Sequence, residues 1–280
     1  RSTLFPYTTL FRSARLRKSV RNYDGKRLPD EIVRKLRSFL KDADNPFGVN
    51  VDLRYLDAGE FNLSSPFVTG EKAYVAGTVH TVPFAEIAFG YTMESFVLYA
   101  QRLGLGTVWL GYITKRESLE KALHKGENQL LPCVVAVGGK ADRRSVREIL
   151  IRKKVKADSR LDFEDIFFAS DFSSPLKENR AGDFLIPLKM LRLAPSAANR
   201  QPWRVVVNGG YAHFYEKKGK KFDRAGVDLQ KIDLGIAMCH FDLAVKACGM
   251  SGEFIVKVPG IAHESDTEYL ISYAAEKLKG

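Results

Sequence analysis

The stretch Ala194-Pro-Ser-Ala-Ala-Asn-Arg-Gln-Pro-Trp203 carries the strongest local signal in this 280-residue chain. Pro195 should end the preceding helix, because the residue before a proline is disfavoured in the helical region. The small residues at 196–198 would let a flat ligand approach the backbone, and Asn199 and Gln201 add side-chain amides that donate and accept hydrogen bonds. An ordinary helix-ending loop would explain the prolines and a core tryptophan, but not this order of polar residues. The stretch therefore indicates a binding loop.

Around this loop, helical and strand patterns alternate along the chain. Apolar residues at 32, 33, 36, 39 and 40 follow Pro29 at helical spacing. The first part of the chain is predicted to contain that helix, a strand at Asn50–Leu56, a helix at Gly90–Leu103 that ends at Gly104, and a buried strand at Leu131–Val137. This order predicts an α+β layer packing.

The same order recurs from about Leu161. The predicted elements there are a helix over Leu185–Leu193, strands at Arg204–Val207 and Tyr211–Tyr215, and a helix over Gly235–Gly249. At an offset of 145, Ile87, Gly90, Met93, Phe96, Leu98 and Gly104 fall on Ile232, Gly235, Met238, Phe241, Leu243 and Gly249. Any two amphipathic helices resemble each other, but the neighbouring elements favour a duplication. Two copies of one unit usually pack about a pseudo-twofold axis, so we expect a monomer with internal symmetry.

The composition sets limits on partners. The formal net charge is +11, but the basic residues are scattered except for a modest cluster over Arg143–Lys156. An anionic small ligand suits this charge as well as nucleic acid does, and we expect no nucleic-acid partner. The longest apolar run, near Leu130–Val137, is far shorter than the roughly 20 residues of a membrane helix, so no membrane association is expected.

The cysteines and histidines indicate no metal. Cys133 lies in an apolar run, and the spacing of Cys239 and Cys248 matches no zinc motif. We expect reduced, buried thiols, which are typical of a cytoplasmic protein.

The first residues need separate treatment. Thr3–Ser13 looks like the translation of a DNA-sequencing adapter, and it lacks the continuous apolar stretch of a targeting segment. Residues 1–13 are therefore expected to be non-native and to lie outside the fold.

The loop at 195–203 and the segment Arg17-Lys-Ser-Val-Arg21 together resemble the two signature segments of the nitroreductase family, and Gly104–Gly111 resembles a third. Taken alone, 17–21 would also fit a solvated basic stretch, but the combination is specific and extends from Ala14 to the C-terminus. The resemblance implies an α+β, nitroreductase-like fold with two tandem copies, 14–160 and 161–280, that form an intramolecular pseudo-dimer with FMN between them.

The resemblance also implies roles for single residues. Arg17, Lys18 and Ser19 would bind the FMN phosphate and ribityl chain, and Arg21 would lie beside the N1 and C2-oxygen edge of the flavin. A cation there stabilises the anionic reduced ring and raises its reduction potential. The remaining contacts implied are the backbone of Leu110 and Gly111, the basic pair Arg152 and Lys153, and the loop residues Pro195, Ser196, Ala197, Asn199 and Gln201.

The basic pair is the least specific of these matches. A longer segment follows Gly138 in place of the family's short Gly-Tyr-Pro connection, which leaves Arg143, Arg144 and Lys154 as competitors for the phosphate.

The implied activity is that of an FMN-dependent oxidoreductase, which passes a hydride from NAD(P)H through the flavin to a small acceptor such as a nitroaromatic or a quinone. No protein residue would react, since the cofactor carries this chemistry. Gly104 and Gly106 do not make a dinucleotide fingerprint, because they follow a helix and lack the third glycine. Three alternatives stay open: a non-catalytic flavin-binding or redox-sensing protein, another reaction on the same scaffold, and a basic nucleic-acid-binding module.

The two copies differ in complementary ways. The first keeps the arm at 17–21, but its helix end at Leu40–Phe47 has no serine or glutamine and carries two acids. The second keeps the loop, but Lys177–Asp183 has no Arg-x-Ser-x-Arg. One complete site, and hence one FMN per chain, is expected.

Overall fold

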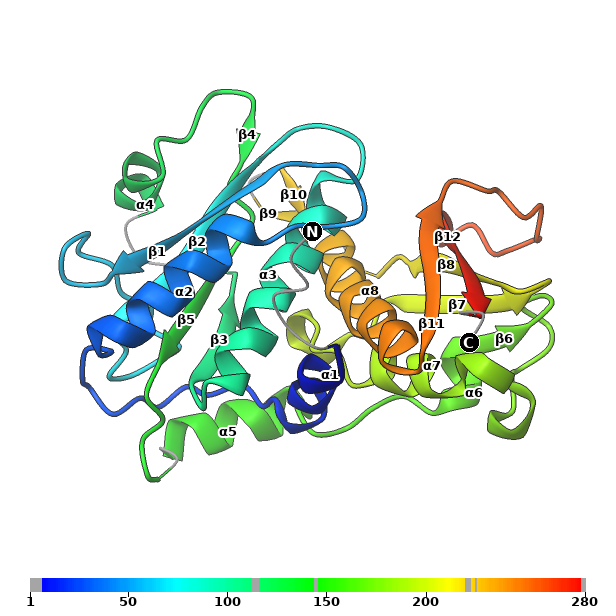
Figure 1. Cartoon of the computed structure of the whole chain (residues 1–280), viewed down its shortest axis with the longest axis horizontal. Helices are drawn as coiled ribbons and strands as arrows, with labels where there is room; N and C mark the ends of the chain where they lie inside the picture. Colours follow the sequence, from blue (N-terminus) through cyan, green and yellow to red (C-terminus); the bar gives the residue numbers. More distant parts are fainter. Residues whose placement is uncertain (1–6, 112–115, 144–145, 220–222, 225, 278–280) are drawn as a thin grey trace.

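Two five-stranded β-sheets lie on opposite sides of a pair of long helices in the computed structural model (Figure 1). The structure describes residues 7–111, 116–143, 146–219, 223–224 and 226–277. The paired helices are α3 (Ala85–Arg102) and α8 (Leu229–Ala247), and most of their residues are buried. They form the centre of one large hydrophobic core to which both sheets contribute.

The first sheet has the strand order β1-β2-β5-β3, with β4 paired to β2. All of its pairs are antiparallel. Helix α2 packs against its β1 edge (Figure 1). The bounds of these elements are α2 Asp30–Asp42, β1 Val51–Asp57, β2 Ala73–His80, β3 Gly106–Leu110, α4 Arg116–Ala122, β4 Gln129–Leu130, β5 Val134–Gly138 and α5 Val146–Lys154.

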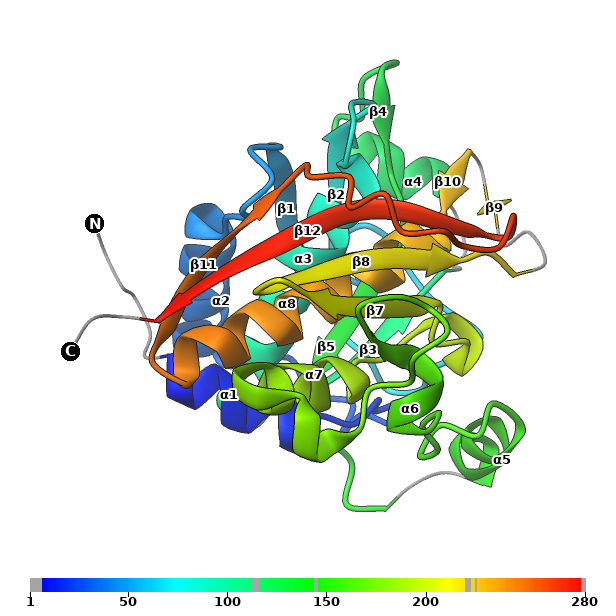
Figure 2. The same cartoon turned by 90° about the vertical axis from the view of Figure 1, so that its right-hand side faces the viewer.

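The second sheet has the order β11-β12-β8-β7-β6 and faces the viewer in Figure 2. Its edge strand β6 runs parallel to β7, and the other pairs are antiparallel. The bounds here are α6 Phe163–Ile166, β6 Phe167–Ala169, α7 Leu185–Arg192, β7 Trp203–Asn208, β8 Tyr211–Lys217, β9 Asp223–Arg224, β10 Val227–Asp228, β11 Met250–Ile255 and β12 Thr267–Lys277, with short 3-10 turns at 178–180, 182–184 and 197–199.

The two sheets share one connection order. In each, a helix leads into an antiparallel strand pair, a long central helix follows, and two further antiparallel strands complete the sheet. The last strand of each half, β5 or β12, lies between its two partners in the sheet. The strands of the first sheet all come from residues before 139 and those of the second all from residues after 166.

The central helices cross at two glycines. A Cβ on Gly90 would lie 2.2 Å from the carbonyl oxygen of Ile232, and a Cβ on Gly235 would lie 2.0 Å from that of Ile87. Gly90 and Ile87 become Gly235 and Ile232 when 145 is added to their numbers, so the two contacts are equivalent. Such reciprocal contacts are typical of an isologous interface. Only glycine permits this backbone approach.

Several predicted elements are confirmed with shifted starts. α3 and α8 begin five and six residues before Gly90 and Gly235. Both end as expected before a glycine with positive φ, +80° at Gly104 and +71° at Gly249. The predicted strand at 131–137 starts only at Val134, after Pro132, which lacks the N–H needed for sheet pairing.

Strands β2 and β3 of the first sheet were not predicted. Residues 106–110 form β3. β2 was not predicted, because seven of its eight residues are buried and the apolar residues do not alternate.

The adapter-like segment also differs from its expectation. Residues from Tyr7 to Leu16 form helix α1, which contacts α3 and α8. Ser13 and Ala14 are 4% exposed, and Phe11 packs against the core. The part from Tyr7 to Ser13 therefore belongs to the fold, whatever its origin.

Cys133 and Cys239 are buried free thiols, whereas Cys248 at the end of α8 is exposed, so the expectation of burial is wrong for Cys248. Among the helices described, none combines the length and apolar character that crossing a membrane requires.

Candidate cofactor site

The arm at 17–21 lies along the first sheet. Ser19 forms a parallel bridge with Thr107 of β3, and the Val20 N–H donates to the Thr107 carbonyl at 2.9 Å. The Arg17 N–H donates to the carbonyl of Ser13 at 2.8 Å, which continues the end of α1. Lys18 is exposed. The backbone of the arm is thus held by α1 at one end and by β3 at its centre.

Arg152 on α5 reaches this arm. Its Nη1 donates to the Ser19 carbonyl at 3.4 Å, and its Nη2 pairs with Asp158. The Arg152 side chain is 9% exposed, although it comes from a basic surface helix. Of the basic candidates that the structure describes, Arg152 is therefore the one whose side chain bonds to the arm.

The other basic candidates lie elsewhere. Lys153 and Lys154 are exposed. Arg143 is exposed and offers its carbonyl to Asn22 at 2.7 Å. Arg144 falls outside the described residues.

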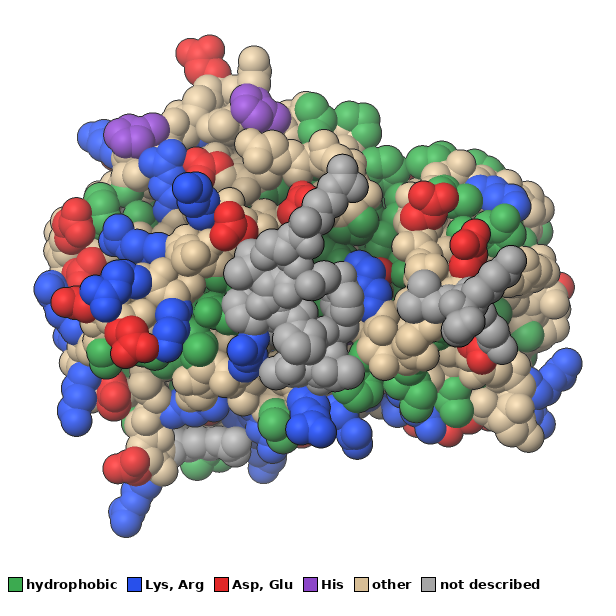
Figure 3. Space-filling view, in the orientation of Figure 1, with side chains coloured by type: hydrophobic (Ala, Val, Ile, Leu, Met, Phe, Trp, Pro, Cys, Tyr) green, Lys and Arg blue, Asp and Glu red, His purple; other side chains and the backbone are tan. Residues whose placement is uncertain are grey.

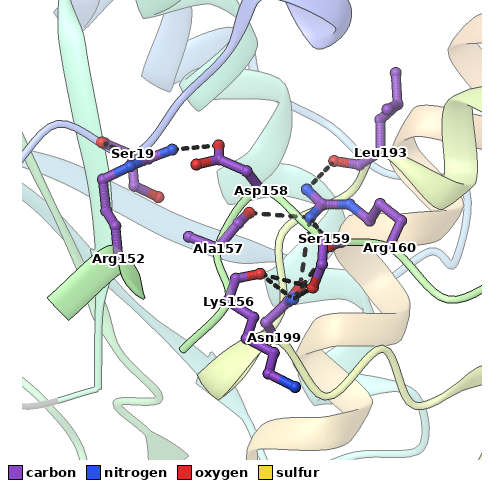
Figure 4. A network of polar contacts seen from close by, with 9 residues as sticks. All are labelled: Ser19, Arg152, Lys156, Ala157, Asp158, Ser159, Arg160, Leu193 and Asn199. Atoms are coloured by element: carbon purple, nitrogen blue, oxygen red, sulfur yellow. Dashed lines mark hydrogen bonds and ion pairs between the residues drawn. The ribbon is translucent and has the colours of Figure 1, made fainter. Parts of the chain in front are cut away.

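The segment 156–160 connects Arg152 to the second half (Figure 4). Asn199 donates through Nδ2 to the Lys156 and Ser159 carbonyls at 2.8 and 3.2 Å. Arg160 Nη1 donates to Asn199 Oδ1 at 3.4 Å, and its Nη2 donates to the Leu193 carbonyl at 3.1 Å. The predicted contacts Ser19, Arg152 and Asn199 are thus brought together through a segment that was not predicted.

Several buried or partly buried guanidinium groups lie close enough at this site to lower one another's pKa. Burial lowers the pKa of Arg17 and of Arg160, and neighbouring guanidinium groups lower them further. The positive charge of Arg152 lowers the pKa of both Arg17 and Arg160. It also lowers the pKa of Arg21, for which burial is the main cause. The nearby carboxylates of Glu94, Asp158 and Glu148 raise the pKa values of Arg17, Arg160 and Arg21, respectively, only in part.

Two nitrogens here are buried and unsatisfied. Neither Arg17 Nε nor Arg160 Nε has a hydrogen-bond partner among the residues that the structure describes. Buried donors of this kind are rare in proteins and suggest that a further group belongs there. The excess of guanidinium groups indicates that this group is an anion.

An open pocket of about 300 Å³ adjoins these residues, and Figure 3 shows Lys and Arg side chains along the lower edge of the molecule where α5 lies in Figure 1. Its lining comprises Ile149, Arg152, Lys153, Lys156, Ala157, Asp158 and Ser159.

The predicted binding loop has an unusual backbone. Ala198, Asn199 and Gln201 have φ values of 51°, 56° and 51°, a region that non-glycine residues seldom occupy. Such strain persists only where surrounding contacts hold it, and it is concentrated at functional sites. One of these contacts comes from Asp233, whose two carboxylate oxygens lie 3.0 Å from the Ala197 N–H. Burial raises the pKa of Asp233 well above its ordinary value.

Some predicted contacts are used inside the chain. Gln201 is 3% exposed; its Oε1 accepts from the Leu161 N–H at 3.0 Å, and its Nε2 donates to the Asn199 carbonyl. Ser196 Oγ accepts from the Gln201 N–H at 2.9 Å. The Gln201 side chain thus belongs to the framework that holds the loop. Pro195 and Ser196 remain partly accessible.

The end of β3 faces the second half. Leu110 is buried in a separate core cluster on the outer side of the first sheet, so only its backbone is available to a ligand. Gly111 is exposed, and a Cβ there would lie 3.8 Å from the Leu229 side chain at the start of α8. Arg21 Nη1 donates to the Phe67 carbonyl at 3.3 Å.

The family model described as "Putative TM nitroreductase" matches residues 9–245. The chain belongs to this nitroreductase family. A Thermotoga maritima protein described as "a putative nitroreductase" has a similar structure, with a TM-score of 0.62, 17% identity, and coverage of 95% of this chain and 92% of that one. At this identity the match shows the nitroreductase-like fold alone.

Shorter solved structures match about half of the chain. A Bacteroides fragilis nitroreductase with bound FMN covers 49% of this chain and 91% of its own, at 19% identity and a TM-score of 0.39. A nitroreductase family protein from Clostridium difficile covers 52% and 90%, at 16% identity and a TM-score of 0.38. No curated protein sequence matched.

Sequence reasoning missed four polar residues at or next to the candidate site: Arg160, Glu94, Asp233 and His240, whose Nε2 lies 2.9 Å from Glu94 Oε1. The last three had a detectable signal, since each is a titratable residue within a strongly apolar helical segment, and such residues are almost always paired when buried. Arg160 lies at the junction between the two halves, where no local pattern distinguishes it.

Proposed function

We propose that this chain binds FMN at the arginine-rich site and uses it as an oxidoreductase. The observation that carries the proposal is the set of buried, unsatisfied guanidinium donors on Arg17 and Arg160 beside Arg152. FMN ends in a phosphate, whose oxygens accept charge-assisted hydrogen bonds from several guanidinium groups at once. Membership of the nitroreductase family supports this choice of anion.

Each segment has a role in the proposed site. Arg17, Arg152 and Arg160 would hold the phosphate, and Lys18 and Lys153 would add positive charge from its solvent side. Ser19 and Asn199 would orient the ribityl chain. Arg21 would lie at the N1 edge of the flavin.

The remaining backbone would position the ring between the two halves. Gly111 has no side chain to block one face, and the strained loop at 195–199 approaches from the second half. When bound, FMN would supply hydride transfer between NAD(P)H and a small acceptor such as a nitroaromatic or a quinone. The chain's own residues would bind and orient the cofactor and set its potential.

We further propose that residues 14–160 and 161–280 are two copies of one nitroreductase-like unit, so that a monomer contains the interface of a dimer. The common connection order of the two sheets and the reciprocal contact of Gly90 and Gly235 support this proposal. The free thiols fit the expected cytoplasmic location.

The visible absorption spectrum of the purified protein tests the cofactor. We expect the bands of oxidised flavin, and FMN as the only flavin released by denaturation. A colourless protein that cannot be reconstituted with FMN would contradict the proposal.

Steady-state oxidation of NADH and NADPH, measured with and without a nitroaromatic or a quinone, tests the activity. Turnover that depends on the acceptor is expected. Bound FMN without turnover would instead support a flavin-binding or redox-sensing protein. Protein without flavin that binds nucleic acid with steep salt dependence would support the basic module.

A further inference from the structure

Glu94 is a fully buried carboxylate at the centre of the molecule, in the middle of α3. Its Oε2 accepts from Trp109 Nε1 at 2.8 Å, and its Oε1 lies 2.9 Å from His240 Nε2. The same Oε1 is 3.8 Å from Arg17 Nε, the unsatisfied donor of the arm. Both carboxylate oxygens are therefore oriented by other side chains, and one of them faces the proposed cofactor site.

His240 is held from its other side as well. Its Nδ1 lies 3.2 Å from the Met190 carbonyl, which can only accept, so Nδ1 must carry a hydrogen. Nε2 then faces the Glu94 carboxylate. This hydrogen bond fixes the direction of Glu94.

These contacts join the three segments of the proposed site. Arg17 belongs to the arm, and Trp109 lies two residues before Gly111 at the end of β3. Met190 belongs to α7, whose end leads into the loop that begins at Pro195. Glu94 is thus linked to the arm directly, to β3 through Trp109, and through His240 to the helix that leads into the loop.

Among the described residues, the second half has no equivalent network. At the offset of 145, Glu94 falls on Cys239 and Trp109 on Phe254, and the segment that corresponds to the arm, Lys177–Asp183, has no Arg-x-Ser-x-Arg. Cys239 is fully buried and Phe254 packs against the rings of Phe214 and Tyr273. In the part of the chain that the structure describes, the buried carboxylate of α3 is therefore the one that lies beside the arm, whereas the buried Asp242 of α8 is held by Tyr91 and Tyr273.

We propose that Glu94 is a positioning residue for the FMN site, in which its buried carboxylate, oriented by Trp109 and His240, holds the Arg17 guanidinium toward the cofactor phosphate. This proposal rests on the proposed function. Removing the charge of Glu94 would leave Arg17 without its counter-ion at the site, so Arg17 would lose its defined direction.

The test compares Glu94→Gln with Asp242→Asn as a matched control. Asp242 is also a buried carboxylate between the central helices, held by Tyr91 and Tyr273 at 2.5 and 2.7 Å, but it has no described contact with the arm. FMN affinity is measured by titrating apo-protein and following flavin fluorescence. We expect Glu94→Gln to weaken binding about 10- to 100-fold and Asp242→Asn to change it less than about twofold.

A double-mutant cycle with Arg17→Ala distinguishes positioning from general destabilisation. If Glu94 acts through Arg17, Glu94→Gln should weaken FMN binding little further once Arg17 is absent. Full additivity of the two changes, or an unchanged dissociation constant in Glu94→Gln, would overturn the proposal.

Amide hydrogen exchange in the apo-protein gives a readout that does not depend on FMN. The N–H groups of Arg17, Val20 and Arg21 are hydrogen-bonded in the structure, and we expect them to exchange faster in Glu94→Gln but not in Asp242→Asn. If wild-type protein does not bind FMN, the proposed function fails. Exchange alone then decides the role of Glu94, and unchanged rates in Glu94→Gln would refute it.

Glu94→Gln could prevent folding, and Trp109→Phe then replaces it. This variant removes only the Trp109 hydrogen bond to the carboxylate and keeps the aromatic packing. We expect Trp109→Phe to weaken FMN binding and to speed up amide exchange in the arm, each by less than Glu94→Gln. Wild-type FMN affinity together with wild-type exchange rates would overturn the proposal.

Discussion

At the scale of single residues, the proposed cofactor site is marked by guanidinium groups that the described chain leaves incompletely paired. Arg160 is the most informative of them. Its Nη atoms donate to backbone carbonyls, including that of Leu193, while its Nε has no partner among the described residues. Burying a donor without a partner costs about 1–3 kcal/mol, so a ligand that accepts from it gains that amount.

Arg160→Ala should therefore weaken FMN binding by about 10- to 100-fold, as expected for the loss of a hydrogen bond to a charged group. Equilibrium titration of apo-protein with FMN measures the effect. Arg116→Ala is the control, because Arg116 also donates to a backbone carbonyl, that of Leu131 at 2.9 Å, but lies away from the site. Equal affinity in Arg160→Ala and wild type would remove Arg160 from the phosphate site.

The buried carboxyl of Glu216 gives a second prediction at the scale of single residues. It lies opposite Trp203 in the second sheet and is 1% exposed, and its Oε2 has no described partner. Burial and the nearby Asp228 carboxylate raise the pKa of Glu216 to about 7. A carboxyl whose pKa is higher in the folded state stabilises the protein only while it is protonated, so this stability is lost as the pH rises through 7.

Glu216→Gln should thus melt close to wild type near pH 5 and roughly 3 °C or more above it at pH 8. Thermal denaturation at the two pH values measures the difference. Glu253→Gln, which removes an exposed carboxylate from the same sheet, serves as the control. A difference between Glu216→Gln and wild type that does not grow with pH would contradict the assignment.

At the scale of elements, the contact of α3 with α8 determines how closely the two halves approach. The backbones meet at Gly90 and Gly235, where a Cβ would overlap a carbonyl oxygen of the other helix. Carbonyl oxygens within a helix cannot move aside as a flexible side chain can, so the crossing requires both glycines.

Gly90→Ala should destabilise the protein by about 2–3 kcal/mol, although alanine is the better helix former by roughly 1 kcal/mol. Chemical denaturation measures the change. Gly126→Ala is the matched control, because its φ is not positive and the nearest atom, in the Gln129 side chain, is 3.6 Å away. If both variants had wild-type stability, the helices would not cross as closely as described.

Helix α1 gives a prediction that reverses the sequence-based expectation. Phe11 packs against the core, and the Ser13 carbonyl accepts from the Arg17 N–H at the start of the arm. Deleting residues 1–13 should lower stability by about 1–3 kcal/mol, the contribution of one large apolar side chain. It should also weaken FMN binding.

Deleting residues 1–6 leaves α1 whole and is the control for this truncation. Thermal denaturation and flavin content report the two effects. A protein that lacks 1–13 and keeps both wild-type values would restore the view that the segment is dispensable.

At the scale of the whole molecule, the two halves share a topology but not a site. The segment of the first half that corresponds to the binding loop contains Phe47, whose ring packs against Phe84, Tyr91 and Phe254. The segment of the second half that corresponds to the arm forms two 3-10 turns over 178–184. The interface between the two halves thus has an aromatic cluster at the position that is equivalent to the arginine cluster.

This asymmetry predicts one FMN per chain. Asp42 and Asp44 lie near the position equivalent to the binding loop, and their negative charge would repel both a phosphate and a reduced flavin. Protein concentration from amino-acid analysis, compared with the flavin released by denaturation, gives the ratio directly. A ratio near two would overturn the asymmetry, and a ratio near one in the double variant Arg17→Ala, Asn199→Ala would locate the flavin elsewhere.

The sequence by itself determined the features that depend on local physical chemistry. Helical spacing located α2, α7 and the two central helices, and glycines with positive φ defined where the latter end. The order of elements indicated the repetition, and the segments at 17–21 and 195–203 indicated the family. These signals lie within short windows of the chain and do not require knowledge of distant contacts.

Only the tertiary structure decided which residues meet. Strand β2 lacks alternation because it is buried on both faces, and that burial is a property of the whole assembly. Arg160 and Glu94 come within electrostatic range of Arg17 from positions about 140 and 75 residues further along the chain, and Gln201 bonds within the framework of its loop. The direction of a side chain depends on partners brought close by folding, so local sequence identified the candidate segments but could not assign the individual contacts.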